Sequence, residues 1–88
     1  MKLRGEYVVR KIVDEIVVVP VGKTSLEFKG MIVLNEVSEV IWSCLKKETT
    51  FEEILQCILE QFEVSEQEAK EDILSILDTL RCAKLLEE

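Results

Sequence analysis

Hydrophobic positions in the first third of the chain follow the spacing of β-strands. Residues 7–13 mix β-branched and aromatic residues with basic ones, which predicts an edge or half-buried strand, and Asp14-Glu15 supplies a tight polar turn. Residues 16–19 read Ile-Val-Val-Val, a run typical of a strand covered on both faces, and Pro20 ends it because proline cannot donate to a ladder. We therefore expect a hairpin whose second strand is central in the sheet.

A third extended element is predicted between residues 25 and 34. Leu26 and Phe28 alternate with Glu27 and Lys29, and an apolar run resumes after Gly30. The pair Lys29-Gly30 fits either a two-residue hairpin turn or a glycine bulge within one bent strand, and the sequence does not separate the two. A sheet this small leaves at least one edge unpaired.

From Asn35 onward the hydrophobic spacing becomes helical. Asn35 is a candidate N-cap, and Thr50 and Ser65 each begin a capping box with a glutamate three residues later. Apolar residues then recur at three- and four-residue spacing after each start, which predicts three helices. Leu85-Leu86 are expected to dock on the core as a short extended tail. The predicted fold class is α+β, with three strands followed by three helices in one domain over residues 1–88.

Composition narrows the function classes. A chain of 88 residues forms one small core, which disfavours a deep active site. No apolar run approaches the length of about 18 residues needed to span a bilayer, and the N-terminus leads into a strand pattern, so we expect a cytoplasmic protein without a membrane partner. Cys44, Cys57 and Cys82 are odd in number and widely spaced, which predicts reduced thiols at small apolar positions and neither disulfides nor a metal site.

Charge is divided unevenly along the chain. Residues 1–47 carry eight Lys and Arg against six Asp and Glu, whereas residues 48–88 carry three against twelve. The acidic second half should repel phosphate backbones, which argues against a nucleic-acid partner. A positively charged partner suits this half better, although an acidic face often serves only solubility.

The residues that most enzymes use are missing. The chain has no histidine, which removes the commonest general base and metal ligand, and its three glycines stand apart, so no phosphate-binding loop or cofactor site is predicted. Thr50 and Ser65 are accounted for as caps. Trp42 lies beside an apolar helical stripe, so we expect it to anchor the first helix to the sheet and not to stack a ligand. The chain is predicted not to be an enzyme.

The junction between the last strand and the first helix resembles the PqqD-like family. The resemblance rests on Leu34-Asn35-Glu36 followed after four residues by Ile41-Trp42, with support from the strands before it, the Thr50-led and Ser65-led helices and the closing Ala83-Lys84-Leu85-Leu86. It covers nearly the whole chain. The chain departs from the family pattern where Val37-Ser38 replaces a frequent Thr-Gly pair.

This resemblance implies a winged-helix-like RiPP recognition element, which has a three-stranded antiparallel sheet followed by a three-helix bundle. Such a domain binds the leader of a ribosomally made precursor peptide and presents the precursor to a modifying enzyme, with a radical SAM enzyme suspected here. In the family the leader adds as a strand to the third strand and lies against the third helix. Carried onto this sequence, the implied peptide-binding residues are Leu26, Glu27, Phe28, Lys29, Met31, Ile32 and Val33 of the strand and Ile73, Leu74 and Leu77 of the helix, with Lys70 at the rim.

Two other functions fit the same pattern of elements. Three helices with a small sheet can form a winged-helix DNA-binding or regulatory protein, although that reading calls for a basic recognition helix and the third helix is acidic. An open sheet edge can also pair with a second copy of the chain, as in a dimerisation or scaffold protein. We expect a monomer or a weak homodimer.

Overall fold

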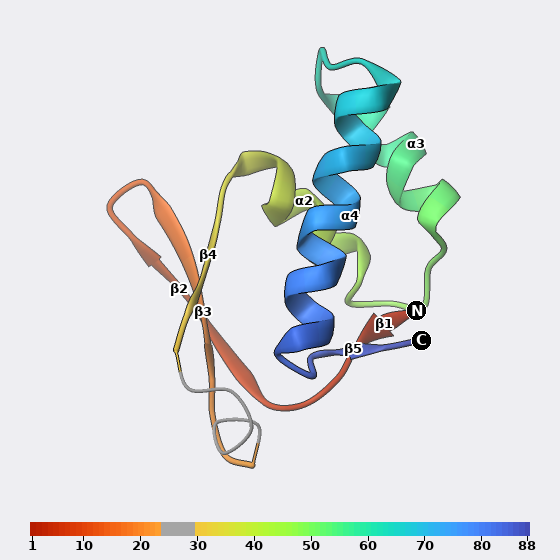
Figure 1. The fold of residues 1–88 in the computed structure, drawn as a ribbon. Helices are drawn as coiled ribbons and strands as arrows, with labels where there is room; N and C mark the ends of the chain where they lie inside the picture. Colours follow the sequence, from red (N-terminus) through yellow and green to blue (C-terminus); the bar gives the residue numbers. More distant parts are fainter. Residues whose placement is uncertain (24–29) are drawn as a thin grey trace.

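The computed structural model of the chain describes residues 1–23 and 30–88 (Figure 1). Strands β2 (Tyr7–Ile12), β3 (Glu15–Pro20) and β4 (Ile32–Leu34) form an antiparallel sheet in the order β2-β3-β4. The prediction of a central second strand is confirmed. Val17 and Val18 point to opposite faces of β3, and both are buried, as the continuous β-branched run indicated.

The hairpin between β2 and β3 turns one residue earlier than predicted. Ile12 pairs with Glu15, so the two loop residues are Val13 and Asp14, and Glu15 belongs to the strand. Val13 has a φ of 57°, a left-handed conformation that β-branched residues rarely adopt. The sequence pointed to the more polar pair because turns favour polar residues, whereas the register of the flanking strands decides the position.

The helices begin where the capping residues predicted. They are α2 (Glu36–Cys44), α3 (Phe51–Gln61) and α4 (Glu66–Cys82), and their N-caps are Asn35, Thr50 and Ser65. Each cap side chain accepts a hydrogen bond from the backbone N–H three residues later, which satisfies an otherwise unpaired donor of the first turn.

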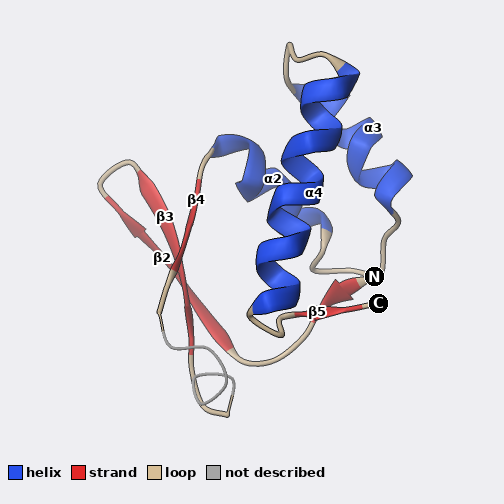
Figure 2. Ribbon diagram, viewed as in Figure 1, coloured by secondary structure: helices blue, strands red, loops and turns tan. Residues whose placement is uncertain are grey.

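The helices cover one face of the sheet. In Figure 2, α4 lies between the sheet and α3, and α2 continues directly from β4. The core joins the inner face of the sheet to all three described helices through Val18, Ile32, Leu34, Ile41, Ile54, Ile58, Ile73, Leu77 and Leu80. Trp42 is buried, with its ring edge-to-face against Tyr7 at a centroid distance of 4.8 Å. The predicted role of Trp42 as an anchor between helix and sheet is confirmed.

The two chain ends meet in a small second sheet. Strand β1 (Lys2–Leu3) pairs antiparallel with β5 (Leu86–Glu87), and Figure 1 shows the termini side by side. Leu85 and Leu86 are buried, as the predicted tail required. The partner strand β1 was not predicted, because two residues are too few to show a hydrophobic period.

The expectation about the cysteines is only partly met. Cys44, Cys57 and Cys82 are free thiols, and Cys44 and Cys57 are half-buried. Cys82 is exposed at the end of α4, so the prediction that it fills an apolar position is wrong. No helix in the described part of the chain has the length and apolar character to cross a membrane.

Candidate functional site

Among the described residues, β4 is an end strand and its outer edge has no backbone partner. Across residues 1–23 and 30–88, β3 is the only strand that pairs with β4, and no loop or helix backbone bonds to Ile32–Leu34. Unpaired N–H and C=O groups along a strand edge form a template for another extended chain. The edge predicted from the sequence is therefore present in the structure.

The strand register shows which backbone groups face outward. Val21 N donates to the carbonyl oxygen of Glu6 at 3.0 Å, and the two-residue turn makes Glu15 a hydrogen-bonded partner of Ile12. Because hydrogen-bonded pairs alternate along an antiparallel ladder, the odd-numbered residues of β3 bond to β2 and the even-numbered ones bond to β4. The even residues of β3 pair with Ile32 and Leu34.

By the same alternation, the N–H and C=O groups of Val33 point away from β3. The backbone groups of Met31, just before the strand, point away from β3 as well. The side chains of both residues are also exposed, at 54% for Val33 and 62% for Met31. The open edge thus offers two donors and two acceptors.

The open edge of β4 ends at Asn35, the N-cap residue of α2. The N–H of Asn35 donates to Ser38 Oγ at 2.8 Å, and the carbonyl oxygen of Asn35 accepts from the Glu39 N–H at 2.9 Å. Both backbone groups of Asn35 therefore have partners within the chain. An added strand would pair with Val33 and Met31 and would stop at Asn35.

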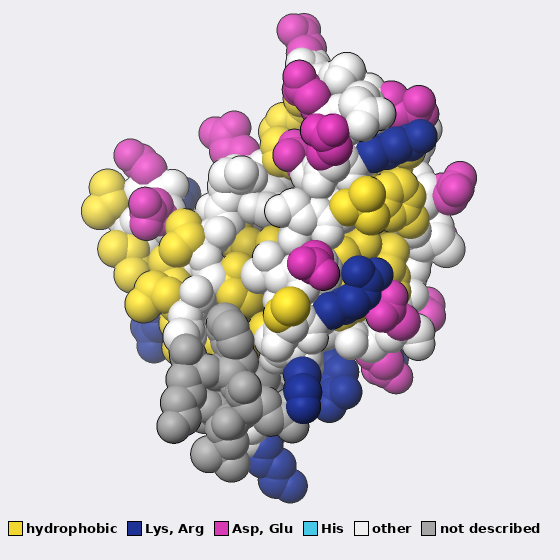
Figure 3. Space-filling view, in the orientation of Figure 1, with side chains coloured by type: hydrophobic (Ala, Val, Ile, Leu, Met, Phe, Trp, Pro, Cys, Tyr) yellow, Lys and Arg dark blue, Asp and Glu magenta, His cyan; other side chains and the backbone are white. Residues whose placement is uncertain are grey.

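A groove of about 370 Å³ runs between this edge and α4. Its lining comes from β4 and its flanks, the start of α2 and one face of α4, and consists of Met31, Ile32, Val33, Asn35, Ser38, Asp72, Ser75, Ile76 and Thr79. Figure 3 shows hydrophobic side chains over the sheet and acidic ones around the N-terminal half of α4. The groove thus borders both kinds of surface.

The groove has an apolar base and a polar helical wall. Ile32 and Ile76 are almost fully buried at 5% and 8% exposure, whereas Asp72, Ser75 and Thr79 are exposed. Thr79 Oγ1 donates to the carbonyl oxygen of Ser75, so its hydroxyl is already engaged. Asp72 is the one charged residue among the described lining. This arrangement suits a peptide with an apolar side chain pointing inward and a polar or basic one near Asp72.

The described lining of the groove carries few groups for acid–base or metal chemistry. The chain contains no histidine to activate Ser75, and within the described residues no group of three or more Cys, Asp and Glu side chains could hold a metal ion. The chemistry available at the groove is hydrogen bonding, apolar contact and a single carboxylate.

Comparison with known proteins agrees with this geometry. The family described as Coenzyme PQQ synthesis protein D (PqqD) matches residues 15–86, which include β3, β4, the groove and all three described helices. The chain belongs to the PqqD family. A search of curated proteins found no match.

A solved structure is similar over the full length of this PqqD-family chain. It is described as TbiB1 in complex with the TbiA(beta) leader peptide, and its sequence is 29% identical. The match has a TM-score of 0.74 and covers 99% of this chain and 95% of that one. The predicted α+β fold, with an antiparallel three-stranded sheet followed by helices, is confirmed.

The structure places the predicted strand residues at the groove. Met31, Ile32 and Val33 line it, with the Met31 and Val33 backbones on the open edge and the Ile32 side chain at the base. Residues 26–29, which comprise Leu26, Glu27, Phe28 and Lys29, lie outside the described residues, and so does the choice between a turn and a bulge at Lys29-Gly30.

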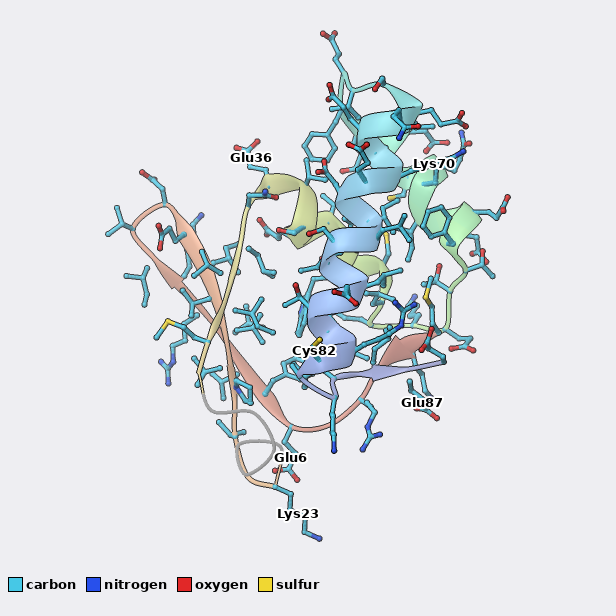
Figure 4. All side chains as sticks on the ribbon, viewed as in Figure 1. Glu6, Lys23, Glu36, Lys70, Cys82 and Glu87 are labelled. Atoms are coloured by element: carbon cyan, nitrogen blue, oxygen red, sulfur yellow. The ribbon has the colours of Figure 1, made fainter. Side chains whose placement is uncertain are left out.

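The helix face that the resemblance implied is not the face that lines the groove. Ile73 and Leu77 are buried in the core at 0% and 1% exposure, so they support the groove from beneath. Leu74 is exposed but lies about 200° around α4 from Asp72. Figure 4 shows Lys70 on the α3 side of the helix, where its Nζ lies 3.9 Å from Glu66. The predicted binding role of this helix stays a prediction, and the face of α4 that lines the groove carries Asp72, Ser75, Ile76 and Thr79.

Sequence reasoning missed six lining residues of this PqqD-family groove. They are Asn35, Ser38, Asp72, Ser75, Ile76 and Thr79. Four of them recur on α4 at positions 72, 75, 76 and 79, the spacing of a single helix face. That face mixes one apolar residue with three polar ones, so hydrophobic periodicity gave no signal for it.

Proposed function

We propose that this chain is a RiPP recognition element that binds the leader of a ribosomally made precursor peptide. The leader adds as a strand to the outer edge of β4 and lays alternate side chains into the groove against α4. The observation that carries the proposal is the open edge at Met31 and Val33 directly beside that groove. Membership of the PqqD family and the likeness to a leader-bound TbiB1 structure support it.

Backbone pairing alone would bind the leader weakly. Four hydrogen bonds at a net 0.5–1.5 kcal/mol each contribute about 4 kcal/mol, whereas micromolar affinity requires about 8 kcal/mol. Ordering a flexible peptide costs a further ~1–2 kcal/mol per residue. Side chains must supply the difference, and burying a Leu- or Phe-sized residue contributes ~1.5–3 kcal/mol. The leader should therefore carry spaced apolar anchors that enter the groove above Ile32 and Ile76.

The chain holds the precursor for a separate modifying enzyme, of the radical SAM type in our proposal, and does not itself catalyse the modification. Its groove has a single carboxylate and no histidine, which supports a binding role. We place it in the cytoplasm as a monomer or weak homodimer. The acidic outer surface of α4 supports a peptide partner over nucleic acid, since Glu66, Glu68, Glu71 and Asp72 would repel phosphates.

A proline at Val33 tests the proposal directly. Val33→Pro removes the outward N–H and leaves the donors of Ile32 and Leu34, which bond to β3, in place. The control Val33→Ala shortens the same exposed side chain but keeps the N–H. The reading frames beside this gene are first searched for a short precursor, and its synthetic leader half is then the probe. The leader is titrated by calorimetry against each variant after circular dichroism has verified folding.

We expect Val33→Pro to weaken binding roughly tenfold to a hundredfold relative to Val33→Ala, because a lost hydrogen bond with an unsatisfied partner costs about 1–3 kcal/mol. Equal affinities of the two folded variants would rule out strand addition at β4. Failure of the wild-type chain to bind this leader would contradict the proposed function itself.

A further inference from the structure

A second hollow lies between α2 and α3, outside the groove lining. It has a volume of about 340 Å³ and is lined by Glu39, Val40, Ser43, Cys44, Cys57 and Gln61. None of these six residues lines the β4–α4 groove. Leader binding at β4 therefore does not explain why this hollow is present.

The hollow brings two of the three cysteines together. Cys44 is the last residue of α2 and Cys57 lies in the middle of α3, and both residues line the hollow between the two helices. Burial, followed by the influence of the neighbouring Cys57, raises the pKa of the Cys44 thiol from 9.0 to about 11. At neutral pH Cys44 is thus a protonated thiol beside a second thiol.

The two thiols differ in their surroundings. Gln61 Nε2 donates a hydrogen bond to Cys57 Sγ at 3.1 Å, so a polar side chain orients this sulfur at the wall of the hollow. Both cysteines are half-buried next to an open hollow, so a small reagent can reach them. Cys57 is therefore placed to react first, with Cys44 beside it to react second.

We infer that Cys44 and Cys57 form an oxidation site at which hydrogen peroxide converts the two thiols into a reversible disulfide that links α2 to α3. The Cys57 thiolate attacks one peroxide oxygen, so the S–O bond of a sulfenic acid forms as the O–O bond breaks. The other oxygen leaves as hydroxide and takes up a proton to become water. The Cys44 sulfur then attacks the sulfenic sulfur, the S–S bond forms, and the hydroxyl leaves as a second water with the Cys44 proton. Two thiols are oxidised, one peroxide is reduced, and two waters are released.

Electrostatics at the hollow favour this oxidant. Glu39 lines the same space, and the whole chain carries a net charge of −7, so anionic oxidants would be repelled. Hydrogen peroxide is small and neutral. The bond would join residues only 13 positions apart in the chain, and its closure would restrict the unfolded chain.

The experiment treats the reduced full-length chain with hydrogen peroxide, alkylates the remaining thiols, and maps the cysteines by proteolysis and mass spectrometry. We expect the Cys44 and Cys57 peptides to be joined, with the loss of two hydrogen atoms, and the exposed Cys82 not to be part of the cross-link. Cys82→Ser should retain the product, and both Cys44→Ser and Cys57→Ser should lose it. Oxidation of Cys57 without joining to Cys44, or cross-links that mainly involve Cys82, would overturn the inference.

Thermal unfolding provides a second measurement on the wild-type chain. The disulfide should raise the melting temperature by about 10 °C, a dithiol reductant should reverse the rise, and Cys57→Ser should show none. An unchanged melting temperature in wild-type chains that carry the Cys44–Cys57 bond would contradict the proposed link between the helices. The test uses no leader peptide, so its outcome is independent of the proposed function.

Discussion

Val13 stores backbone strain at the tip of the β2–β3 hairpin. Its φ of 57° falls in the left-handed region, whereas Asp14 after it does not share that conformation. A positive φ at the first of two loop residues is the pattern of a type II′ turn, in which glycine is the preferred residue. The Val13 side chain is 85% exposed, so its burial contributes almost nothing to offset this strain.

Replacing Val13 by glycine should therefore stabilise the protein. Relief of the strain outweighs the extra freedom of glycine in the unfolded chain, and we expect a net gain of about 1 kcal/mol in the free energy of unfolding. Urea unfolding of Val13→Gly would measure it. Val13→Ala is the control, because alanine also avoids positive φ and should show little gain. Equal stability of the two variants would mean that the turn is not strained.

At the scale of elements, local signals predicted the starts of helices well and the short strands poorly. Asn35, Thr50 and Ser65 each cap a helix through contacts within three residues, so the sequence alone contains the signal. Strand β1 spans two residues, and its pairing with β5 depends on a partner at the other end of the chain. Contacts of that range leave no local pattern.

Prediction of the groove from the sequence has the same limit, because only part of it depends on local patterns. Its strand side follows from sheet order, which the β-branched run of β3 predicted, but its helical side depends on how α4 is rotated against the sheet. Buried apolar residues such as Ile73 recur at three- and four-residue spacing, and this pattern identifies the face of a helix that packs in the core. The face that carries Asp72 and Thr79 is half polar and has no such signature.

Leu86 tests the contribution of the terminal sheet. Its side chain is 8% exposed and packs in the core, opposite Leu3 of β1. Leu86→Ala should lower the free energy of unfolding by about 2–3 kcal/mol, and Glu87→Ala, at the exposed neighbouring position, should change it by less than about 0.5 kcal/mol. Urea unfolding would measure both. Similar stabilities for the two variants would show that β5 contributes little to the fold.

At the scale of the whole molecule, most residues that stabilise the fold are distinct from the surface proposed to bind the leader. The buried core lies among α2, α3, α4 and the inner face of the sheet, while the open edge of β4 and the polar face of α4 remain available. An incoming strand can therefore bind without rearrangement of the core. Basic residues in such a strand would approach the acidic helical half faster at low salt, which raises the association rate more than the affinity.

The most direct test of strand addition is amide hydrogen exchange at β4, followed by NMR with and without saturating leader peptide. The N–H of Val33 faces outward and should exchange at least about tenfold more slowly once the leader is bound, because it gains a ladder partner. The amides of Ile32 and Leu34 already bond to β3 and serve as internal references. Unchanged exchange at Val33 in the fully bound protein would contradict the account.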